Sequence, residues 1–310
     1  MFSLERGQTR RGDWVLLGIL VLLAGLGISA MLSASYYRSD ITFGAPLYLF
    51  KWQAIILGLS LIPALVFAVL SPERLRMLVP FFLLSAAILM GLTFVPGIGH
   101  SIQGARRWIA LFGFTFQPSE YVKLVLIIYL AHIFSKKQER VTDFINTVLP
   151  PLIVVIGFTG LVYLQNDFST AFFVLFLSLS IFFIAGIPLL YFFLLGGVSI
   201  PMLLVMLLSK EHRVMRIISF LNPESDPVGS GYQMRIAREA LMDGGLWGSG
   251  LGQSVHKLGG LPEPHSDFVF AVLGEEVGFI GVLAVICVFI AFAVRGYQIS
   301  IESDDKFAKY

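Results

Sequence analysis

The sequence predicts an all-α polytopic membrane protein, and its composition supports this directly. Of its 310 residues, 56% are hydrophobic and only 14% are charged, whereas soluble domains carry roughly 25% charged residues. The mean hydropathy is +0.82. The formal net charge of +2 is too small to indicate nucleic-acid binding, and the single cysteine, Cys287, excludes a disulfide framework. The chain lacks the polar surface that would enclose a core in water.

Eight segments are apolar enough to cross a bilayer as helices, which takes about 20 mostly apolar residues. The first segment is too long to be a cleavable signal and leads straight into further helices. We find no internal repeat and no second globular domain, so residues 1–310 are expected to form a single membrane-embedded domain. The predicted spans are residues 14–34, 47–70, 78–96, 117–134, 147–164, 168–185, 189–208 and 268–294.

Lys and Arg gather before the first span and after the second, fourth and eighth spans. The positive-inside rule therefore predicts that both termini are cytoplasmic. The opposite side then holds the segment 97–116, the turn 165–167 and a long extracytoplasmic loop, 209–267, between spans 7 and 8. Within that loop the pattern of 234–241 predicts a short amphipathic helix.

Two groups of ionisable residues stand at the outer ends of spans, where they mark either function or a need for pairing. Glu120 and Lys123 are three residues apart and share a helix face, so they form a mutually neutralised pair or line a polar cavity. Asp167 lies in a tight turn, where its carboxylate can cap the next helix. Capping and function are compatible at this position.

The last predicted span opens on a polar mouth that contains His265 and Asp267, and Glu275 and Glu276 follow within the span. The two glutamates can bond to hydroxyl or backbone groups of packed helices, and Asp267 can be a helix cap. The alternative is a site at the outer mouth, because several titratable groups crowd there.

Arginines are also expected outside, against the positive-inside trend. Arg106, Arg107 and Trp108 form either an anchor at lipid headgroups or a site for phosphate, whose oxygens match the planar guanidinium fork. Arg213 and Arg216 in the long loop raise the same two alternatives. Because these side chains share the predicted outer end, we expect a site that opens to the outer leaflet.

Several stretches resemble one family in order and spacing from residue 14 to about 300. They are Gly104–Ile109, Gln117–Glu120 with Lys123, Gln165–Thr170, Asn222-Pro223, Gly229–Gln233, Gly248–Gly252, and Leu261–Val272 with Glu275–Phe279. The sequence is thus similar to the SEDS family (shape, elongation, division and sporulation) of bacterial peptidoglycan glycosyltransferases. The segment Ser254–Leu258 resembles the cell-division branch more than the elongation branch.

The chain departs from the family pattern in two places. The turn 165–170 reads Gln-Asn-Asp-Phe-Ser-Thr, where the family usually has Gln-Pro-Asp-Leu-Gly-Thr, so the Asp is retained. The family has ten spans, so the last two spans are expected to be missing from these 310 residues.

The resemblance implies an inverting transfer that polymerises lipid II into glycan strands, with undecaprenyl pyrophosphate as the leaving group. It implies a class B penicillin-binding protein and other division proteins as partners, in the bacterial cytoplasmic membrane at the division septum. Asp267 is then the candidate general base. Arginines, or a divalent cation such as Mg²⁺ or Mn²⁺, are expected to stabilise the pyrophosphate. No other cofactor is expected, and the metal ligands are unknown.

The remaining candidate substrate contacts are Arg106, Arg107, Trp108, Glu120, Lys123, Asp167, Arg213, Arg216, His265 and Glu275. Two other functions compete with the transferase: a lipid II flippase, and a non-catalytic scaffold for the penicillin-binding protein. A flippase should place polar groups along its whole path, whereas these residues cluster at one end. The sequence therefore favours the transferase.

Overall fold

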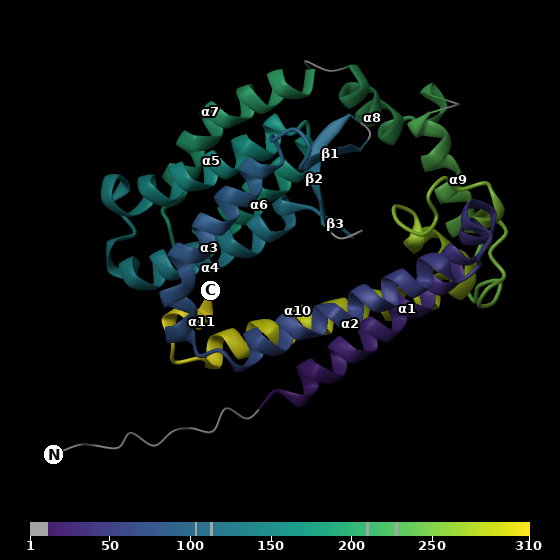
Figure 1. Ribbon diagram of the computed structural model, residues 1–310, viewed down its shortest axis with the longest axis horizontal. Coiled ribbons are helices and arrows are strands. Elements are labelled where there is room, and N and C mark those ends of the chain that lie inside the picture. The colour runs from purple at the N-terminus through teal and green to yellow at the C-terminus, as the bar shows by residue number, and fades with distance from the viewer. Residues whose placement is uncertain (1–11, 103, 112–113, 209–210, 227–228) are drawn as a thin grey trace. The chain divides into compact units, whose positions relative to one another are not determined.

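The computed structural model describes residues 12–102, 104–111, 114–208, 211–226 and 229–310, and most of them are helical (Figure 1). The elements are α1 (Trp14–Phe43), α2 (Tyr48–Val69), α3 (Pro72–Leu92), β1 (Gly99–Ile102), β2 (Ala105–Leu111), β3 (Phe114–Phe116), α4 (Pro118–Lys137), η1 (Gln138–Arg140), η2 (Phe144–Val148), α5 (Leu149–Leu164), α6 (Phe168–Ile184), α7 (Leu189–Leu208), α8 (Glu211–Leu221), η3 (Pro223–Ser225), α9 (Ser230–Asp243), η4 (His256–Leu258), α10 (Val269–Glu302) and α11 (Lys306–Lys309).

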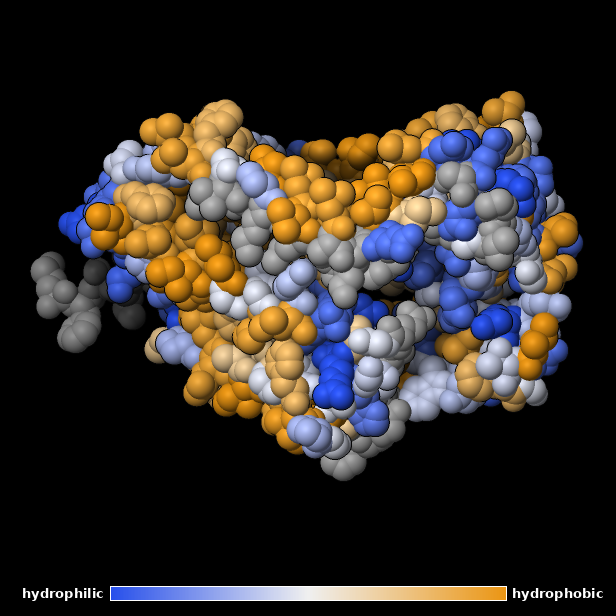
Figure 2. All heavy atoms as spheres, turned by 90° about the horizontal axis from the view of Figure 1, so that it is seen from above, coloured by the Kyte–Doolittle hydropathy of each residue, from blue (hydrophilic) through white to orange (hydrophobic). Residues whose placement is uncertain are grey.

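A helix coincides with each predicted span: α1 to α7 and α10. Among the described residues, five helical stretches are long and apolar enough to cross a membrane, namely α1, α2, α3, η2 with α5, and α10. Hydrophobic side chains cover broad areas of the molecular surface (Figure 2). Exposed apolar patches of such extent mark a surface that contacts lipid or another apolar partner.

The segments between the helices hold more structure than expected. Residues 97–116 contain a three-stranded antiparallel sheet in the order β1-β2-β3, which adds a β element to the expected all-α fold. The long loop 209–267 contains α8, η3, α9 and η4, and α9 extends the predicted amphipathic helix at both ends. Long connections of this kind fold locally because their own backbone groups must be hydrogen-bonded.

The chain divides into two compact units, which are described separately. Unit 1 comprises residues 1–66 and 202–299, and unit 2 comprises residues 67–201 and 300–310. In unit 2, α4 packs against α3, α5, α6 and α11. Phe134, Val122 and Leu126 of α4 are fully buried in the core of this unit. Because α4 is surrounded by other helices, it tolerates more polar residues than a helix that faces lipid.

In unit 1, α1 and α10 run antiparallel and are joined near both ends. Asp13, the N-cap of α1, accepts hydrogen bonds from the Arg295 guanidinium, with Nε at 3.0 Å. The Arg295 side chain thereby holds the pKa of the Asp13 carboxyl below its ordinary value. Toward the other end of α1, the Ser33 hydroxyl donates to Glu276 of α10.

α10 is interrupted at Gly278, and a glycine-rich loop replaces the lost helical hydrogen bonds. Gly278 has φ 67° and ψ −175°, a conformation essentially reserved for glycine. The amides of Phe279 and Ile280 donate to the carbonyls of residues 245 and 246, at 2.9 and 3.2 Å. In return, the amides of residues 249 and 250 donate to the carbonyls of residues 275 and 276, at 2.9 and 3.0 Å. The break therefore leaves these four backbone groups satisfied.

We expect Gly278→Ala to lower the free energy of unfolding by at least about 1–3 kcal/mol, because alanine is strained at this φ and ψ. Its Cβ would also lie 2.3 Å from the Gly248 nitrogen. Gly296→Ala is the matched control in the same helix, since a Cβ there meets nothing within 4 Å. Thermal unfolding of the purified protein in detergent measures both effects. Equal melting temperatures for Gly278→Ala and the wild type would contradict the interruption of α10 at this residue.

Candidate functional site

In unit 2, Asp167 is the centre of a cluster that joins α6, α4 and the sheet. Its carboxylate is 4% exposed. One oxygen accepts from the Thr170 amide at 3.1 Å and so caps α6. The other accepts from Arg107 Nη1 at 2.8 Å and from Gln117 Nε2 at 3.3 Å. Asp167 is thus both a helix cap and a member of a buried polar cluster.

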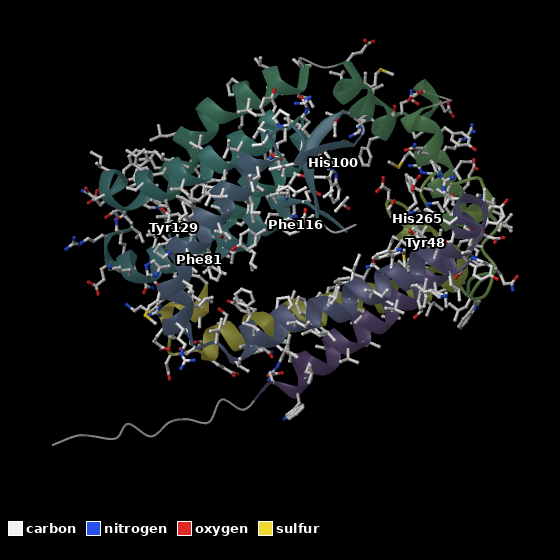
Figure 3. All side chains as sticks on the ribbon, viewed as in Figure 1. Tyr48, Phe81, His100, Phe116, Tyr129 and His265 are labelled. Atoms are coloured by element: carbon white, nitrogen blue, oxygen red, sulfur yellow. The ribbon has the colours of Figure 1, made fainter. Side chains whose placement is uncertain are left out.

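A β-bulge directs Arg107 toward this cluster. Arg106 pairs with Ser101 and Trp108 pairs with His100, so Arg107 is the extra residue on β2. Bulges change the direction of a side chain and are frequent beside active sites. Figure 3 shows His100 and Phe116 on the strands that flank β2. The sequence carries no clear signal for the bulge, because a turn residue such as glycine is absent from this position.

Glu120 and Lys123 form the predicted pair one turn further along α4. Lys123 Nζ lies 2.7 Å from Glu120 Oε2 and 5.0 Å from the centre of the Phe173 ring in α6. The Glu120 side chain is 56% exposed, however, and that of Lys123 is 22% exposed. The pair is therefore made, but it is not buried, and its contribution to stability is smaller than that of a buried pair.

The other predicted cations differ in their surroundings. Arg106 is exposed on β2, and Arg216 is exposed on α8. Arg213 lies on α8, but its side chain is outside the described residues. Trp108 is half-buried, and among the described residues its Nε1 finds no hydrogen-bond acceptor. Arg106 and Arg216 remain accessible to an anion, whereas Arg107 is committed to Asp167.

In unit 1, Asp267 lies in the turn that precedes α10 and is exposed. Its amide donates to the Glu263 carbonyl at 3.2 Å, and Glu263 has φ 49°. Within the described part of the chain, no hydrogen-bond donor contacts the Asp267 carboxylate, so it does not cap α10. His265, marked in Figure 3, has Nε2 3.6 Å from Glu263 Oε2, and Glu263 also pairs with Arg38 at 3.1 Å.

Glu275 is buried below this turn and holds the loop that contains η4. Its carboxylate accepts from the Ser254 hydroxyl at 2.5 Å and from the Val255 amide at 2.8 Å. His256 Nδ1 lies 3.2 Å from the same carboxylate. Glu275 therefore positions the loop, and its predicted contact with a substrate stays a prediction.

Glu276 forms a buried ion pair that sequence reasoning missed. Lys257 Nζ lies 2.7 Å from Glu276 Oε1 and donates to the Ser33 hydroxyl at 2.8 Å. The Lys257 and Glu276 side chains are 7% and 2% exposed. The residues are 19 positions apart, and nothing in the local pattern indicates that they meet.

The predicted residues are divided between the two units. Arg107, Glu120, Lys123 and Asp167 share unit 2 with the sheet residues Arg106 and Trp108, while His265, Asp267, Glu275 and Arg216 belong to unit 1. Among the described residues, no group of three or more His, Cys, Asp or Glu side chains could hold a metal ion. A divalent cation at the site stays a prediction.

We expect Arg107→Gln to lower the free energy of unfolding by about 1–3 kcal/mol, because it strands a buried carboxylate. Arg106→Gln, on the exposed side of the same strand, should change stability by no more than about 0.5 kcal/mol. Chemical denaturation of the purified variants compares the two directly. Equal effects would mean that the Arg107–Asp167 contact contributes nothing specific.

A double-mutant cycle on Glu120→Ala and Lys123→Ala should give a coupling energy of about 0.2–1 kcal/mol, as for other exposed pairs. The reason is that half of the Glu120 side chain stays exposed. Thermal stability and turnover are measured for the two single variants and the double variant. A coupling of several kcal/mol would show that this pair is buried in the working protein.

The family model for the cell cycle proteins FtsW, RodA and SpoVE matches residues 13–310. A probable peptidoglycan glycosyltransferase FtsW from Trichlorobacter lovleyi is 36% identical over 298 residues, which cover 96% of this chain and 78% of that protein. These matches confirm the family resemblance inferred from the motifs, and they are consistent with its cell-division branch.

Solved structures also share the fold. A chain of a peptidoglycan synthase complex that coordinates polymerization and crosslinking superposes with a TM-score of 0.74 at 25% identity, over 96% of this chain and 80% of that one. The rod shape determining protein RodA of Thermus thermophilus gives a TM-score of 0.66 at 25% identity, over 96% and 79%. With its apolar helices, the protein described here is a multi-pass membrane protein, and it belongs to the FtsW/RodA/SpoVE family of cell cycle proteins.

Proposed function

We propose that this chain is a peptidoglycan glycosyltransferase that polymerises lipid II into glycan strands, with Asp267 as the general base. The observation that carries the proposal is the state of the Asp267 carboxylate. It is exposed in a turn at the start of α10, and no donor in the described residues occupies it. A carboxylate without an internal partner is available to accept a proton from a substrate hydroxyl.

The reaction follows from this assignment. The acceptor hydroxyl loses its proton to Asp267 as its oxygen attacks the anomeric carbon of the donor. The bond between that carbon and the pyrophosphate oxygen breaks, and attack from the opposite face inverts the configuration. The undecaprenyl pyrophosphate leaves with the bonding electrons, so cationic groups are needed where this negative charge develops.

Each unit offers one predicted arginine that is available to bind a phosphate group: Arg106 in unit 2 and Arg216 in unit 1. Both are exposed, and among the described residues neither pairs with a carboxylate. Arg107 is instead bound to Asp167, so its proposed role is to hold the sheet against α6. The polar cluster around Asp167, with Glu120 and Lys123, is proposed as the part of unit 2 that contacts the substrate.

We further propose that all eight apolar helices cross the membrane and that both ends of the described chain face the cytoplasm. The Asp13–Arg295 contact supports this within unit 1, because it puts the start of α1 and the end of α10 at one level. Within unit 2, Arg76 in α3 pairs with Asp305 beside α11. Each contact joins segments that the positive-inside rule assigns to the same side.

The proposed partner is a class B penicillin-binding protein that cross-links the new strands at the division septum, together with other division proteins. The fold similarity to a chain of a peptidoglycan synthase complex supports such an assembly. The undecaprenyl tails of the substrates would lie along the apolar helix surfaces in the bilayer, whose lipids they resemble chemically.

Asp267→Asn should lower polymerisation by roughly 10²–10⁴-fold, because the amide keeps the shape of the side chain but cannot accept the proton. The assay uses the protein in liposomes with labelled lipid II, with and without the penicillin-binding protein, and separates the glycan product by length. Asp243→Asn, an exposed aspartate at the end of α9, is the matched control.

The same assay distinguishes the competing functions. Near-normal polymer from a folded Asp267→Asn variant would overturn the assignment of the base. A wild-type protein that moves lipid II across the bilayer without forming polymer would be a flippase. Polymer that forms only from the partner's own activity, independent of Asp267, would leave this chain a scaffold.

A further inference from the structure

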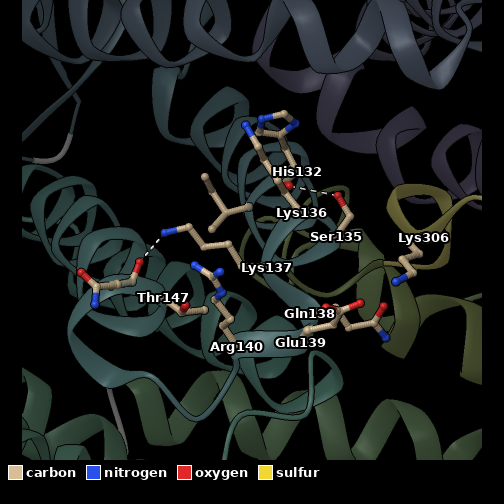
Figure 4. Close-up of a pocket in the computed structure, with 11 residues that line it drawn as sticks. His132, Ser135, Lys136, Lys137, Gln138, Glu139, Arg140, Thr147 and Lys306 are labelled. Atoms are coloured by element: carbon tan, nitrogen blue, oxygen red, sulfur yellow. Dashed lines mark hydrogen bonds between the residues drawn. The ribbon is translucent and has the colours of Figure 1, made fainter.

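A basic pocket lies at the end of unit 2 where α4 finishes, far along that helix from the Asp167 cluster (Figure 4). It has a volume of about 540 Å³ and is lined from α4, η1, η2 and α11. Its cations are Lys136, Lys137, Arg140 and Lys306, and Glu139 is the one carboxylate in the described lining. Nothing in the proposed glycosyl transfer uses these residues.

The positive charge of this pocket is largely uncompensated. Among the described residues, Lys136, Arg140 and Lys306 have no carboxylate oxygen within 4.0 Å. Lys137 donates to the Asn146 carbonyl, which is neutral. The neighbouring Asp305 carboxylate pairs with Arg76 instead. A concave site that is lined by four cationic side chains and one carboxylate favours an anion from outside.

A buried hydroxyl in the lining also lacks a partner. Thr147 is 1% exposed, and its Oγ1 makes no hydrogen bond to any described residue. An unsatisfied buried polar group typically costs about 1–3 kcal/mol. A ligand that accepts a hydrogen bond from Thr147 removes this cost. The hydroxyl is therefore a second, independent indication that the pocket holds a ligand.

The helix dipole explains the positions of only some of these cations. Lys136 and Lys137 lie in the last turn of α4, where cations stabilise the helix C-terminus. Arg140 lies beyond that helix and Lys306 begins a different one, so neither is placed by the α4 dipole. The dipole also gives no reason for the buried Thr147 hydroxyl.

We propose that this pocket binds a phosphate group, supplied by the headgroup of an anionic phospholipid or by a soluble phosphate compound. The guanidinium of Arg140 can meet two phosphate oxygens at once, and ammonium groups supply further charge-assisted hydrogen bonds. Basic pockets beside spanning helices on the cytoplasmic side are typical sites for anionic headgroups. The proposal does not depend on the role of Asp267, because it concerns binding alone.

The test measures the affinity of the purified full chain, in neutral detergent, for short-chain phosphatidylglycerol, short-chain phosphatidylcholine and inorganic phosphate. Arg140→Gln/Lys306→Gln should weaken binding of the anionic ligand about thirtyfold, since each lost charge is worth about 1 kcal/mol. Arg74→Gln/Lys309→Gln is the matched control. It removes one Arg and one Lys from the same predicted side, one of them from α11, and neither residue lines the pocket.

Thr147→Val provides the decisive variant. The proposal expects about tenfold weaker binding of the anion, from loss of one charge-assisted hydrogen bond. Stability without ligand should be unchanged or higher, because the unsatisfied hydroxyl is gone. A purely structural threonine would leave affinity for the anion unchanged, and that result would overturn the proposal.

The ligand series identifies the source of the phosphate. Saturable binding of phosphatidylglycerol that inorganic phosphate does not displace supports a lipid headgroup. Saturation by inorganic phosphate, with displacement of the lipid, supports a soluble ligand. Equal weakening in the pocket and control double variants, or no saturable binding of either ligand to wild type, would mean that only bulk charge acts here.

Discussion

Every backbone polar group that this chain places among apolar helices must find its partner within the protein, because lipid offers none. The interruption of α10 at Gly278 shows the consequence. Four backbone groups freed by the break are bonded to the loop that contains residues 245–250. The loop can approach so closely because Gly244 and Gly248 lie against α10: a Cβ on Gly248 would lie 2.2 Å from the Glu276 carbonyl oxygen. The long loop is thus held to α10 by the hydrogen bonds that the interrupted helix needs.

The same requirement separates the carboxylates by role. Asp167, Glu275 and Glu276 are all buried, and each is held by donors from a different part of its own unit. Their charge is used to connect segments that are distant in sequence. Asp267 alone among these four is exposed and lacks an internal donor in the described structure. In unit 1, the carboxylates of Glu275 and Glu276 are bonded within the fold, whereas the Asp267 carboxylate is available to exchange a proton.

Composition and local spacing were sufficient to predict the helices and some of the site. The apolar stretches located the eight helical segments, although α1 and α10 end nine and eight residues later than predicted. The helix α3 begins earlier than expected because Ser71 caps it and Pro72 occupies its first turn. The cap at Asp167 and the Glu120–Lys123 pair followed from residue types three positions apart. The bulge at Arg107, the break at Gly278 and the Lys257–Glu276 pair did not, because each depends on a contact between separate segments. The glycines of residues 244–252 and the span 268–294 were both visible in the sequence, but the contact between them was not.

Positive charge is neutralised near the start of α4 but not near its end. This difference affects which ligands the protein can bind. The helix has 20 residues, so its ends are about 30 Å apart at 1.5 Å per residue. Near its start, the Arg107 charge is neutralised by Asp167 within the fold. At its far end, Lys136, Arg140 and Lys306 face a common pocket beside the unpartnered Thr147 hydroxyl. An anion bound there would contact α4, η1, η2 and α11 together. Because a ligand that binds only the folded arrangement stabilises it, such binding would hold these four elements in place while leaving the Asp167 cluster chemically unchanged.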